Sequence, residues 1–350
     1  MELLRLVLSD EQLSMWVAGF PVWALFLVLA VCIALLSKGA DYMVDGAVAL
    51  ARRTGLPRIV IGATIISLGT TTPEMFVSVM AAWTGNPGLA LGNGVGSIIF
   101  DTGFIFGLLC IFVRVPVRRY ILNRTGWAQV GAASLLVLLA LGALWLDPVA
   151  PILGRGMGAL LLALLVLYMY LSYRWARESG QVDRREEDIA SRSLGQALGV
   201  ILLGLVGVVA GSRVLVPVAA EGAARLGVPQ DVIAATLVAF GTSVPELMTG
   251  ISAVKKRQPQ IMVGNVVGAD VLNCLFVIGA AAFARPLAVP PSFFLFHFPA
   301  MLLILYSFRL FIFINKDGWF KRWQGAWLLG IYLVYLVLQY ALELGEAHSI

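Results

Sequence analysis

Two stretches of this chain are copies of one another, and any fold it adopts must place them as equivalent units. Residues 55–107 align with residues 227–279 at one fixed offset and without a gap. Roughly a third of the aligned positions are identical, which is far above chance for a period this long. Each copy carries a hydroxyl-rich Pro-Glu motif inside apolar sequence, ending at Glu74 and Glu246. Acids in apolar surroundings of this kind indicate a functional site.

The composition is that of an integral membrane protein. Hydrophobic residues make up 60% of the chain, charged residues 13%, and the mean hydropathy is +0.90. Soluble domains average about 25% charged residues. We therefore expect the lipid bilayer as a partner and no nucleic acid, because the net charge of +5 follows from the loop asymmetry described below. The first 20 residues carry three acids and one arginine, which does not fit a secretory signal.

Hydropathy predicts ten membrane crossings, since a helix needs about 20 apolar residues to cross the hydrocarbon layer. All ten are expected to be α-helices, so the predicted fold class is all-α. The predicted crossings are residues 22–52, 58–83, 89–113, 127–146, 152–173, 194–226, 230–254, 260–282, 293–314 and 323–344.

Lysine and arginine are concentrated in one of the two sets of loops between these crossings. The positive-inside rule places that set in the cytoplasm, and both termini then lie outside. The basic residues of this set are Arg52, Arg53, Arg58, Arg114, Arg118, Arg119, Arg124, Arg174, Arg177, Arg184, Arg185, Arg192, Lys255, Lys256, Arg257, Lys316, Lys321 and Arg322.

Each half of the chain holds five predicted crossings, which is an odd number. The second copy must therefore cross the membrane in the opposite sense to the first. Such inverted repeats are typical of secondary transporters, whose sites lie near the membrane midplane. The predicted organisation is an external segment (1–20), a first five-helix repeat (21–173), a cytoplasmic linker (174–193) and a second five-helix repeat (194–350).

A proline precedes the repeated glutamate in both copies. Pro73 and Pro245 cannot donate a backbone hydrogen bond, and each ring crowds the carbonyl four residues earlier. We expect both helices to break there and to free carbonyl groups near Ser67 in one copy and Ala239 in the other. Free carbonyls, hydroxyls and carboxylates are hard ligands that suit sodium or calcium. The chain offers no His or Cys cluster of the kind that zinc or copper prefers.

The spacing predicts that the two copies form one site. The helix from Glu74 to the next turn and the following helix down to Asp101 have similar lengths, so both acids return to one depth. Glu246 and Asn273 do the same in the second copy. Two inverted copies can therefore face each other across the midplane. The side chains expected to flank these four are Thr70, Thr71, Ser97, Thr242 and Ser243.

Structural roles are the alternatives for these residues. Glu74 and Glu246 could pair with a base, although neither has one within a helical turn, and Asp101 and Asn273 could make interhelical hydrogen bonds. Asp270, whose counterpart is apolar, could support a ligand or face water. We also expect Lys38 to pair with the acids three and seven residues later. The repeated glycines are expected to let helices pack closely.

At these residues the chain resembles the sodium/calcium exchanger family of the calcium/cation antiporters. The resemblance is carried by Gly-Thr-Thr-Thr-Pro-Glu and Gly-Asn-Gly-Val-Gly-Ser-Ile-Ile-Phe-Asp, ending at Glu74 and Asp101, and by Gly-Thr-Ser-Val-Pro-Glu and Gly-Asn-Val-Val-Gly-Ala-Asp-Val-Leu-Asn, ending at Glu246 and Asn273. It implies that the two glutamates are central ligands shared by calcium and sodium. It further implies hydroxyl ligands and carbonyl ligands, which would come from Thr70, Thr71, Ser97, Thr242 and Ser243, and from Ser67 and Ala239.

Three positions depart from the pattern expected of prokaryotic members. An amide is expected in the first copy and an acid in the second, whereas Asp101 and Asn273 are exchanged. Ala269 replaces an expected serine and removes one hydroxyl. The next position, often Asn, is Ile98 in one copy and Asp270 in the other. These changes bear on the identity and number of counter-ions.

The predicted function is an antiporter of a prokaryotic inner membrane that moves calcium outward against entering sodium by alternating access. It would be no enzyme, need no cofactor and work as a monomer. A proton/calcium exchanger remains open, because three acids in one site would also attract protons, as does an exchanger for another divalent ion. A cation channel fits less well, because an internal repeat completes a site within one chain.

Overall fold

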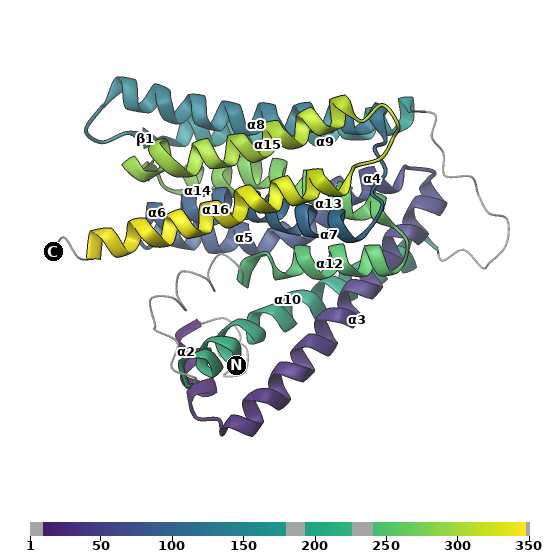
Figure 1. Ribbon diagram of the computed structural model, residues 1–350, viewed down its shortest axis with the longest axis horizontal. Helices are drawn as coiled ribbons and strands as arrows, with labels where there is room; N and C mark the ends of the chain where they lie inside the picture. Colours follow the sequence, from purple (N-terminus) through teal and green to yellow (C-terminus); the bar gives the residue numbers. More distant parts are fainter. Residues whose placement is uncertain (1–9, 180–192, 226–240, 348–350) are drawn as a thin grey trace.

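The computed structural model describes residues 10–179, 193–225 and 241–347, and they are almost wholly helical (Figure 1). The all-α membrane prediction is confirmed at this level. One pair of two-residue strands is present within these residues: β1 (Ile152–Leu153) runs antiparallel to β2 (Leu287–Ala288). A helix starting at residue 152 was therefore a wrong prediction, and α9 begins at Arg155.

The helical elements follow the predicted crossings closely, and several contain wider π-helical segments, labelled η. In the first half they are α2 (Asp10–Ala18), α3 (Val22–Thr54), α4 (Arg58–Ile61), η1 (Gly62–Ile66), α5 (Ser67–Trp83), α6 (Pro87–Ile98), η2 (Ile99–Phe106), α7 (Gly107–Phe112), α8 (Arg119–Leu146) and α9 (Arg155–Glu178). In the second half they are α10 (Leu194–Arg225), α12 (Val244–Lys255), α13 (Pro259–Leu272), η3 (Asn273–Val277), α14 (Ile278–Ala284), η4 (Phe293–His297), α15 (Phe298–Ile314) and α16 (Arg322–Ala347).

Eight helical stretches in the described parts of the chain are long and apolar enough to cross a membrane. The predicted count of ten is thus not confirmed, and residues 230–240 of the seventh predicted crossing lie outside the described residues. Local chemistry explains the boundaries. Asn86 accepts a hydrogen bond from the Leu89 amide at 3.1 Å and starts α6, and Gly55 ends α3 with a left-handed φ of 70°.

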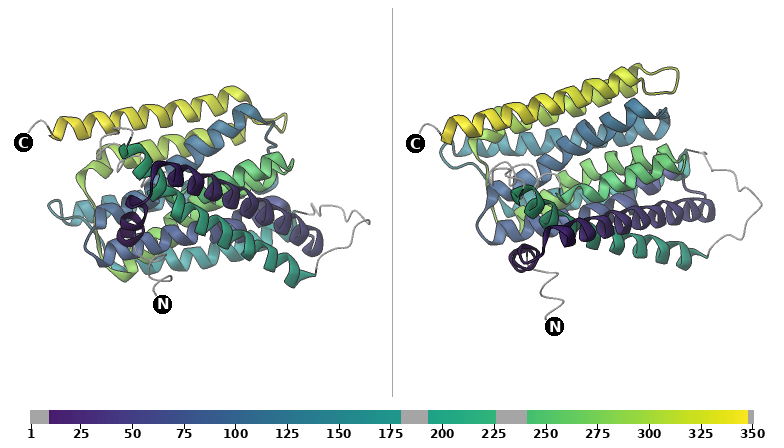
Figure 2. Two further views of the ribbon diagram at one scale, coloured as in Figure 1. Left: turned by 90° about the horizontal axis from the view of Figure 1, so that it is seen from below. Right: turned by 60° about the horizontal axis from the view of Figure 1, so that its bottom comes forward.

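The helices form layers around α5 and α13. In Figure 1, α8 and α9 run along the upper edge and α3 and α10 cross at the lower edge, with α5 and α13 between them. Both views in Figure 2 keep α3 and α10 side by side. Their close approach depends on glycine, because a Cβ atom added at Gly204 would lie 2.5 Å from the Gly39 carbonyl oxygen.

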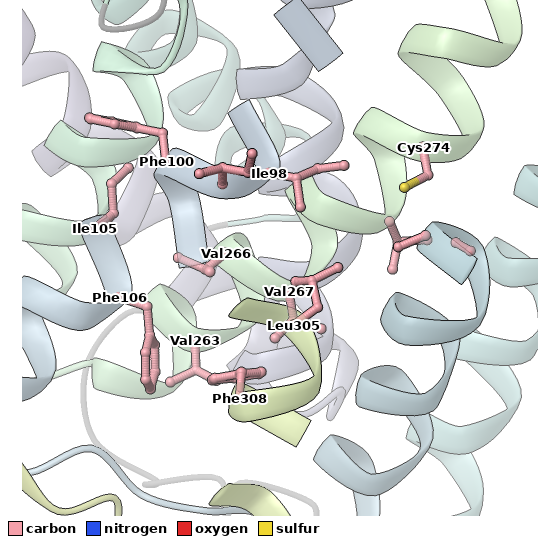
Figure 3. Close-up of a cluster of buried hydrophobic side chains, with 14 of the residues drawn as sticks. Ile98, Phe100, Ile105, Phe106, Val263, Val266, Val267, Cys274, Leu305 and Phe308 are labelled. Atoms are coloured by element: carbon pink, nitrogen blue, oxygen red, sulfur yellow. The ribbon is translucent and has the colours of Figure 1, made fainter. Parts of the chain in front are cut away.

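The most enclosed element is α13, in which every residue from Ile261 to Leu272 is buried. Apolar side chains such as Val263 pack beside Phe106 and Phe308 from neighbouring elements (Figure 3). On another side, a Cβ at Gly268 would lie 2.5 Å from the Ala63 Cα. Close packing is thus confirmed for this glycine, whereas nothing lies within 4 Å of a Cβ at Gly96.

The predicted helix break occurs in one copy only. In the second copy a turn at Ser243 precedes α12, and Pro245 stands in the first turn of that helix. In the first copy α5 continues through Pro73, so the predicted break there is wrong. Proline is tolerated within membrane helices, and hydroxyls bond to carbonyls of the turn before Pro73: Thr70 donates to the Ser67 carbonyl at 3.3 Å and Thr72 to the Leu68 carbonyl at 2.5 Å.

The acids of α3 are tied to α12 rather than to Lys38. Asp45 forms an ion pair with Lys256 at 2.6 Å. The Asp41 carboxylate accepts a hydrogen bond from Ser252 at 2.7 Å. The predicted pairing within α3 is therefore wrong, and these contacts instead join α3 to the helix that carries Glu246.

Candidate ion-binding site

Four polar side chains from four different elements are buried in the middle of the helical core. Glu74 lies on α5, Asp101 on η2 and Glu246 on α12, while Asn273 is the first residue of η3. Each is at most 1% exposed. Two of the four stand in π-helical segments, which are rare and occur frequently at functional sites.

These side chains carry oxygens that lack hydrogen-bond partners among the residues that the structure describes. They are both carboxylate oxygens of Glu74, both of Asp101, Oε2 of Glu246 and Oδ1 of Asn273. Buried polar atoms are normally paired, because leaving one unsatisfied costs about 1–3 kcal/mol and more if it is charged. Unpaired oxygens in this number fit a site that binds a cation.

The charges of the three acids act on one another without a compensating base. Glu74 is repelled by both Glu246 and Asp101, and Asp101 is repelled by Glu246. None of the ion pairs found among the described residues includes these acids. The acids do not form a compact group of three metal-binding carboxylates, and no such group occurs in the described parts of the chain. A cation here would therefore need neutral oxygens as well.

Neutral oxygens from both copies surround the acids. Thr71 donates a hydrogen bond to Glu246 Oε1 at 3.4 Å. Ser243 donates to the Ser97 hydroxyl at 3.3 Å. All three hydroxyl-bearing side chains are buried, at 2% exposure or less. The structure thus brings together the predicted hydroxyls of the two copies.

A reciprocal pair of hydrogen bonds links the copies. Thr70 shares its hydroxyl proton between the Ser67 carbonyl and Asn265 Oδ1, which lies 3.4 Å away, and its counterpart Thr242 donates to Asn93 Oδ1 at 3.1 Å. Each threonine therefore bonds to the asparagine of the other copy. Sequence reasoning had placed both threonines in the site but had given these asparagines no role, although their repetition could have marked them.

Of the two predicted carbonyl ligands, Ser67 lies in the described part of the chain. The Ser67 carbonyl already accepts the Thr70 hydroxyl at 3.3 Å, and an oxygen of this kind has a second lone pair. Ala239 lies outside the described residues.

A second polar cluster adjoins the acids and was not anticipated. Asp270 Oδ2 accepts hydrogen bonds from the Thr102 hydroxyl and from Gln129 Nε2. Gln129 lies on α8, and its only signal in the sequence is that it is an amide within an apolar crossing.

A model of the sodium/calcium exchanger protein family matches residues 24–174 and 196–341. The chain belongs to this family. Its relatives include a membrane protein of Methanocaldococcus jannaschii, 32% identical over 86% of this exchanger-family chain and 93% of that protein. Another is the sodium/calcium exchanger MaX1 of Methanosarcina acetivorans, 27% identical over 89% of this chain and 97% of that protein.

Solved structures agree with this family assignment. A structure of the sodium-calcium exchanger NCX_Mj, soaked with sodium and without calcium, superimposes with a TM-score of 0.77 at 25% identity. The match covers 91% of this chain and 99% of NCX_Mj. Both named exchangers are transporters, in agreement with the prediction that this exchanger-family chain is not an enzyme.

Proposed function

We propose that the chain is an antiporter that moves calcium outward across a prokaryotic inner membrane in exchange for sodium. The observation that carries this proposal is the set of buried carboxylate oxygens without partners on Glu74, Asp101 and Glu246. Calcium takes six to eight oxygen ligands, with carboxylates, carbonyls and hydroxyls all acceptable. Membership of the sodium/calcium exchanger family supports the choice of ions.

The ligands are drawn from both copies of the repeat. The four central groups supply the charge and one amide, and calcium and sodium compete for them. Neutral oxygens complete the coordination. The proposed ligands are Glu74, Glu246, Asp101, Asn273, the hydroxyls of Thr70, Thr71, Ser97, Thr242 and Ser243, and the carbonyls of Ser67 and Ala239.

Two inverted five-helix repeats, over residues 21–173 and 194–350, form this site in a single chain of ten crossings. The reciprocal bonds of Thr70 to Asn265 and of Thr242 to Asn93 support a pseudo-two-fold relation between the copies. The distribution of arginine and lysine supports a cytoplasmic linker (174–193) and external termini, with residues 1–20 outside. The complete site in one chain supports function as a monomer.

Uncompensated charge explains why ions would be exchanged rather than released. The three acids repel each other in surroundings that exclude water, so an empty site is costly to move through the membrane. Bound calcium or sodium offsets this repulsion. The loaded site can therefore reorient between the two sides, while the empty site cannot do so readily.

Calcium uptake into proteoliposomes tests this function. With equal pH on both sides and a protonophore present, an outward sodium gradient should drive calcium into the vesicles. Potassium and proton gradients, imposed separately, serve as controls. Calcium movement that ignores sodium would overturn the sodium/calcium assignment.

A proton/calcium exchanger is the second candidate, and one residue favours it. Ala269 supplies no hydroxyl where its counterpart Ser97 does, which removes one neutral ligand that sodium could use. The acids, which a proton would use, are unaffected. Under this alternative an imposed pH gradient would drive calcium in the absence of sodium.

The inverted topology has its own test. Single cysteines near Arg118 and Arg257 should react with impermeant reagents from the cytoplasmic side, and those near Gly85 and Pro148 from outside. Reaction of the Gly85 position and its counterpart Arg257 from the same side would rule out the inverted relation of the two copies.

A further inference from the structure

The cluster around Asp270 has no counterpart in the other copy of the repeat. The residues equivalent to Asp270 and Thr102 are Ile98 and Cys274, which cannot make the same contacts. The third member, Gln129, comes from α8, outside the repeated stretch. The cluster is therefore a single, asymmetric addition to the two-fold arrangement of the central site.

The three side chains are buried and their hydrogen bonds fix their orientation. Asp270 is 1% exposed, and Thr102 and Gln129 are fully buried. Gln129 Nε2 donates to Asp270 Oδ2 at 2.5 Å, and the Thr102 hydroxyl donates to the same oxygen. The Gln129 amide cannot be turned over, because its oxygen would then lie against the carboxylate.

Within the described parts of the chain, two oxygens of this cluster have no hydrogen-bond partner. They are Oδ1 of Asp270 and Oε1 of Gln129. The two donated hydrogen bonds stabilise the ionised form of Asp270, yet no ion pair in the described parts of the chain includes it. A buried charge without a partner is expensive. One negative charge with an amide oxygen and a hydroxyl matches a cation of a single charge.

We propose that Asp270, Gln129 and Thr102 form a second binding site, separate from the Glu74–Glu246 pair, for one monovalent alkali-metal cation. The ligands are Asp270 Oδ1, Gln129 Oε1 and the second lone pair of the Thr102 hydroxyl, whose first lone pair accepts from Gln129 Nε2 at 3.4 Å. The site adjoins the central acids, because Asp101 immediately precedes Thr102 and is repelled by Asp270. It binds its cation whether or not calcium transport is driven by sodium.

Thermal unfolding of the purified full chain tests this site apart from the central one. The measurement uses a Glu74→Gln/Glu246→Gln background, in which cation binding to the central pair is weakened. Sodium or potassium chloride replaces N-methyl-D-glucamine chloride at constant ionic strength. A ligand that binds only the folded state raises Tm in a saturable way.

In this background the chain with Asp270 should show a saturable rise in Tm with sodium, potassium or both. Adding Asp270→Asn should abolish that rise. In N-methyl-D-glucamine alone, Asp270→Asn should have the higher Tm, because it removes an uncompensated buried charge. The cation that saturates at the lower concentration identifies the preferred occupant. Glu178→Gln, an exposed change on α9, controls for general salt effects.

Gln129→Leu provides a second variant of similar size in case Asp270→Asn does not fold. It removes the amide oxygen and should raise the cation concentration needed for the half-maximal Tm shift. The proposal fails if Asp270→Asn lowers Tm equally in every salt, which indicates a purely structural hydrogen bond. It also fails if acid alone, and no cation, closes the Tm difference, which indicates a bound proton. The proposed antiport is judged separately, from calcium uptake by the unmodified chain.

Discussion

The two copies of the repeat carry the same asparagine but support it differently. In the first copy Asn93 Nδ2 donates to the Glu74 carbonyl and to the Ser78 hydroxyl, each at 3.0 Å. In the second copy the equivalent nitrogen of Asn265 has no hydrogen-bond partner among the described residues. Gly250 stands where the first copy has Ser78, so the missing hydroxyl explains part of the difference.

The two copies also differ in one hydroxyl group and in the continuity of the helix that carries the glutamate. Ser97 accepts a hydrogen bond from Ser243, whereas its counterpart Ala269 has no hydroxyl to offer. The helix α5 is continuous through its proline, while the second copy turns at Ser243 before α12 begins. Among the described residues, Asn93 thus has two hydrogen bonds within its own copy that Asn265 does not have. The two halves therefore share the central glutamates Glu74 and Glu246 and differ in the groups that support them.

The shared acids give the largest predicted effect. Glu74→Gln and Glu246→Gln should each reduce calcium exchange in proteoliposomes to the background of protein-free vesicles, because a divalent ion loses a charged oxygen. Equal losses of calcium exchange in the two variants would show that the glutamates of the two halves contribute equally to calcium binding. Near-normal transport by either variant would remove that glutamate from the ligand set. Glu178→Gln, outside the core, should leave transport unchanged.

The exchanged acid and amide give the next largest effect. We expect Asp101→Asn together with Asn273→Asp to retain several-fold more calcium exchange than either single change. The double variant keeps the total charge and moves it across the pseudo-two-fold axis. Initial rates of calcium uptake, normalised to reconstituted protein, provide the measurement. A double variant no faster than the slower single one would mean that the halves are not interchangeable.

The sequence predicted most of the fold and the central residues because both rest on strong local signals. Long apolar runs locate crossings such as α3 and α15 to within a few residues, and repetition marks Glu74 and Glu246. The strand pair at Ile152 and the continuity of α5 were missed. The strand pair depends on pairing with residues 287–288, a contact that no local pattern records. A proline inside a helix can kink it as well as break it, so Pro73 alone does not decide whether α5 is continuous.

The Asp270 cluster was missed for a related reason. In the sequence, Asp270 differs from its counterpart in the first copy, Ile98, which is apolar. Its partner Gln129 lies 141 positions away and outside the repeat. Comparing the two copies therefore could not reveal it. Only the packing of α8 against α13 brings the amide to the carboxylate.

The hydroxyl difference between Ser97 and Ala269 predicts a moderate effect on sodium. Ala269→Ser should lower the sodium concentration needed for half-maximal exchange, since one added ligand contributes about 1 kcal/mol, or roughly fivefold in affinity. Ser97→Ala should raise that concentration by a similar factor. Sodium titrations of calcium efflux measure both. An effect of Ala269→Ser on proton-driven transport alone would instead favour the proton exchanger.

Removing the hydroxyl that accepts a hydrogen bond from Asn93 should cause a small loss of stability. Ser78→Ala removes the hydroxyl that accepts from Asn93 and that itself donates to the Ala90 carbonyl at 3.1 Å. We expect a cost of about 0.6–1.5 kcal/mol, the range for interhelical hydrogen bonds in membrane proteins and for typical protein hydrogen bonds. Unfolding in detergent measures it. No change in stability would mean that Asn93 is held by the Glu74 carbonyl alone.

The smallest effect comes from giving the second copy the hydroxyl that it lacks. A Cβ at Gly250 would lie 3.0 Å from Leu109 Cδ1, so the end of that flexible side chain must shift by a few tenths of an ångström. Gly250→Ala carries this cost and the gain in helix propensity without the hydroxyl. Gly250→Ser carries the same steric cost and a smaller gain in helix propensity, and it can also accept from Asn265 Nδ2. The difference in unfolding free energy between the serine and alanine variants is therefore measured twice, with Asn265 and with Asn265→Ala, so that the propensity terms cancel and the new hydrogen bond is isolated. We expect the advantage of serine to be about 0.5–1 kcal/mol larger when Asn265 is present. If the serine–alanine difference is the same in both backgrounds, Gly250 is not the reason that Asn265 lacks a partner among the described residues, and the difference between the copies lies in their backbones.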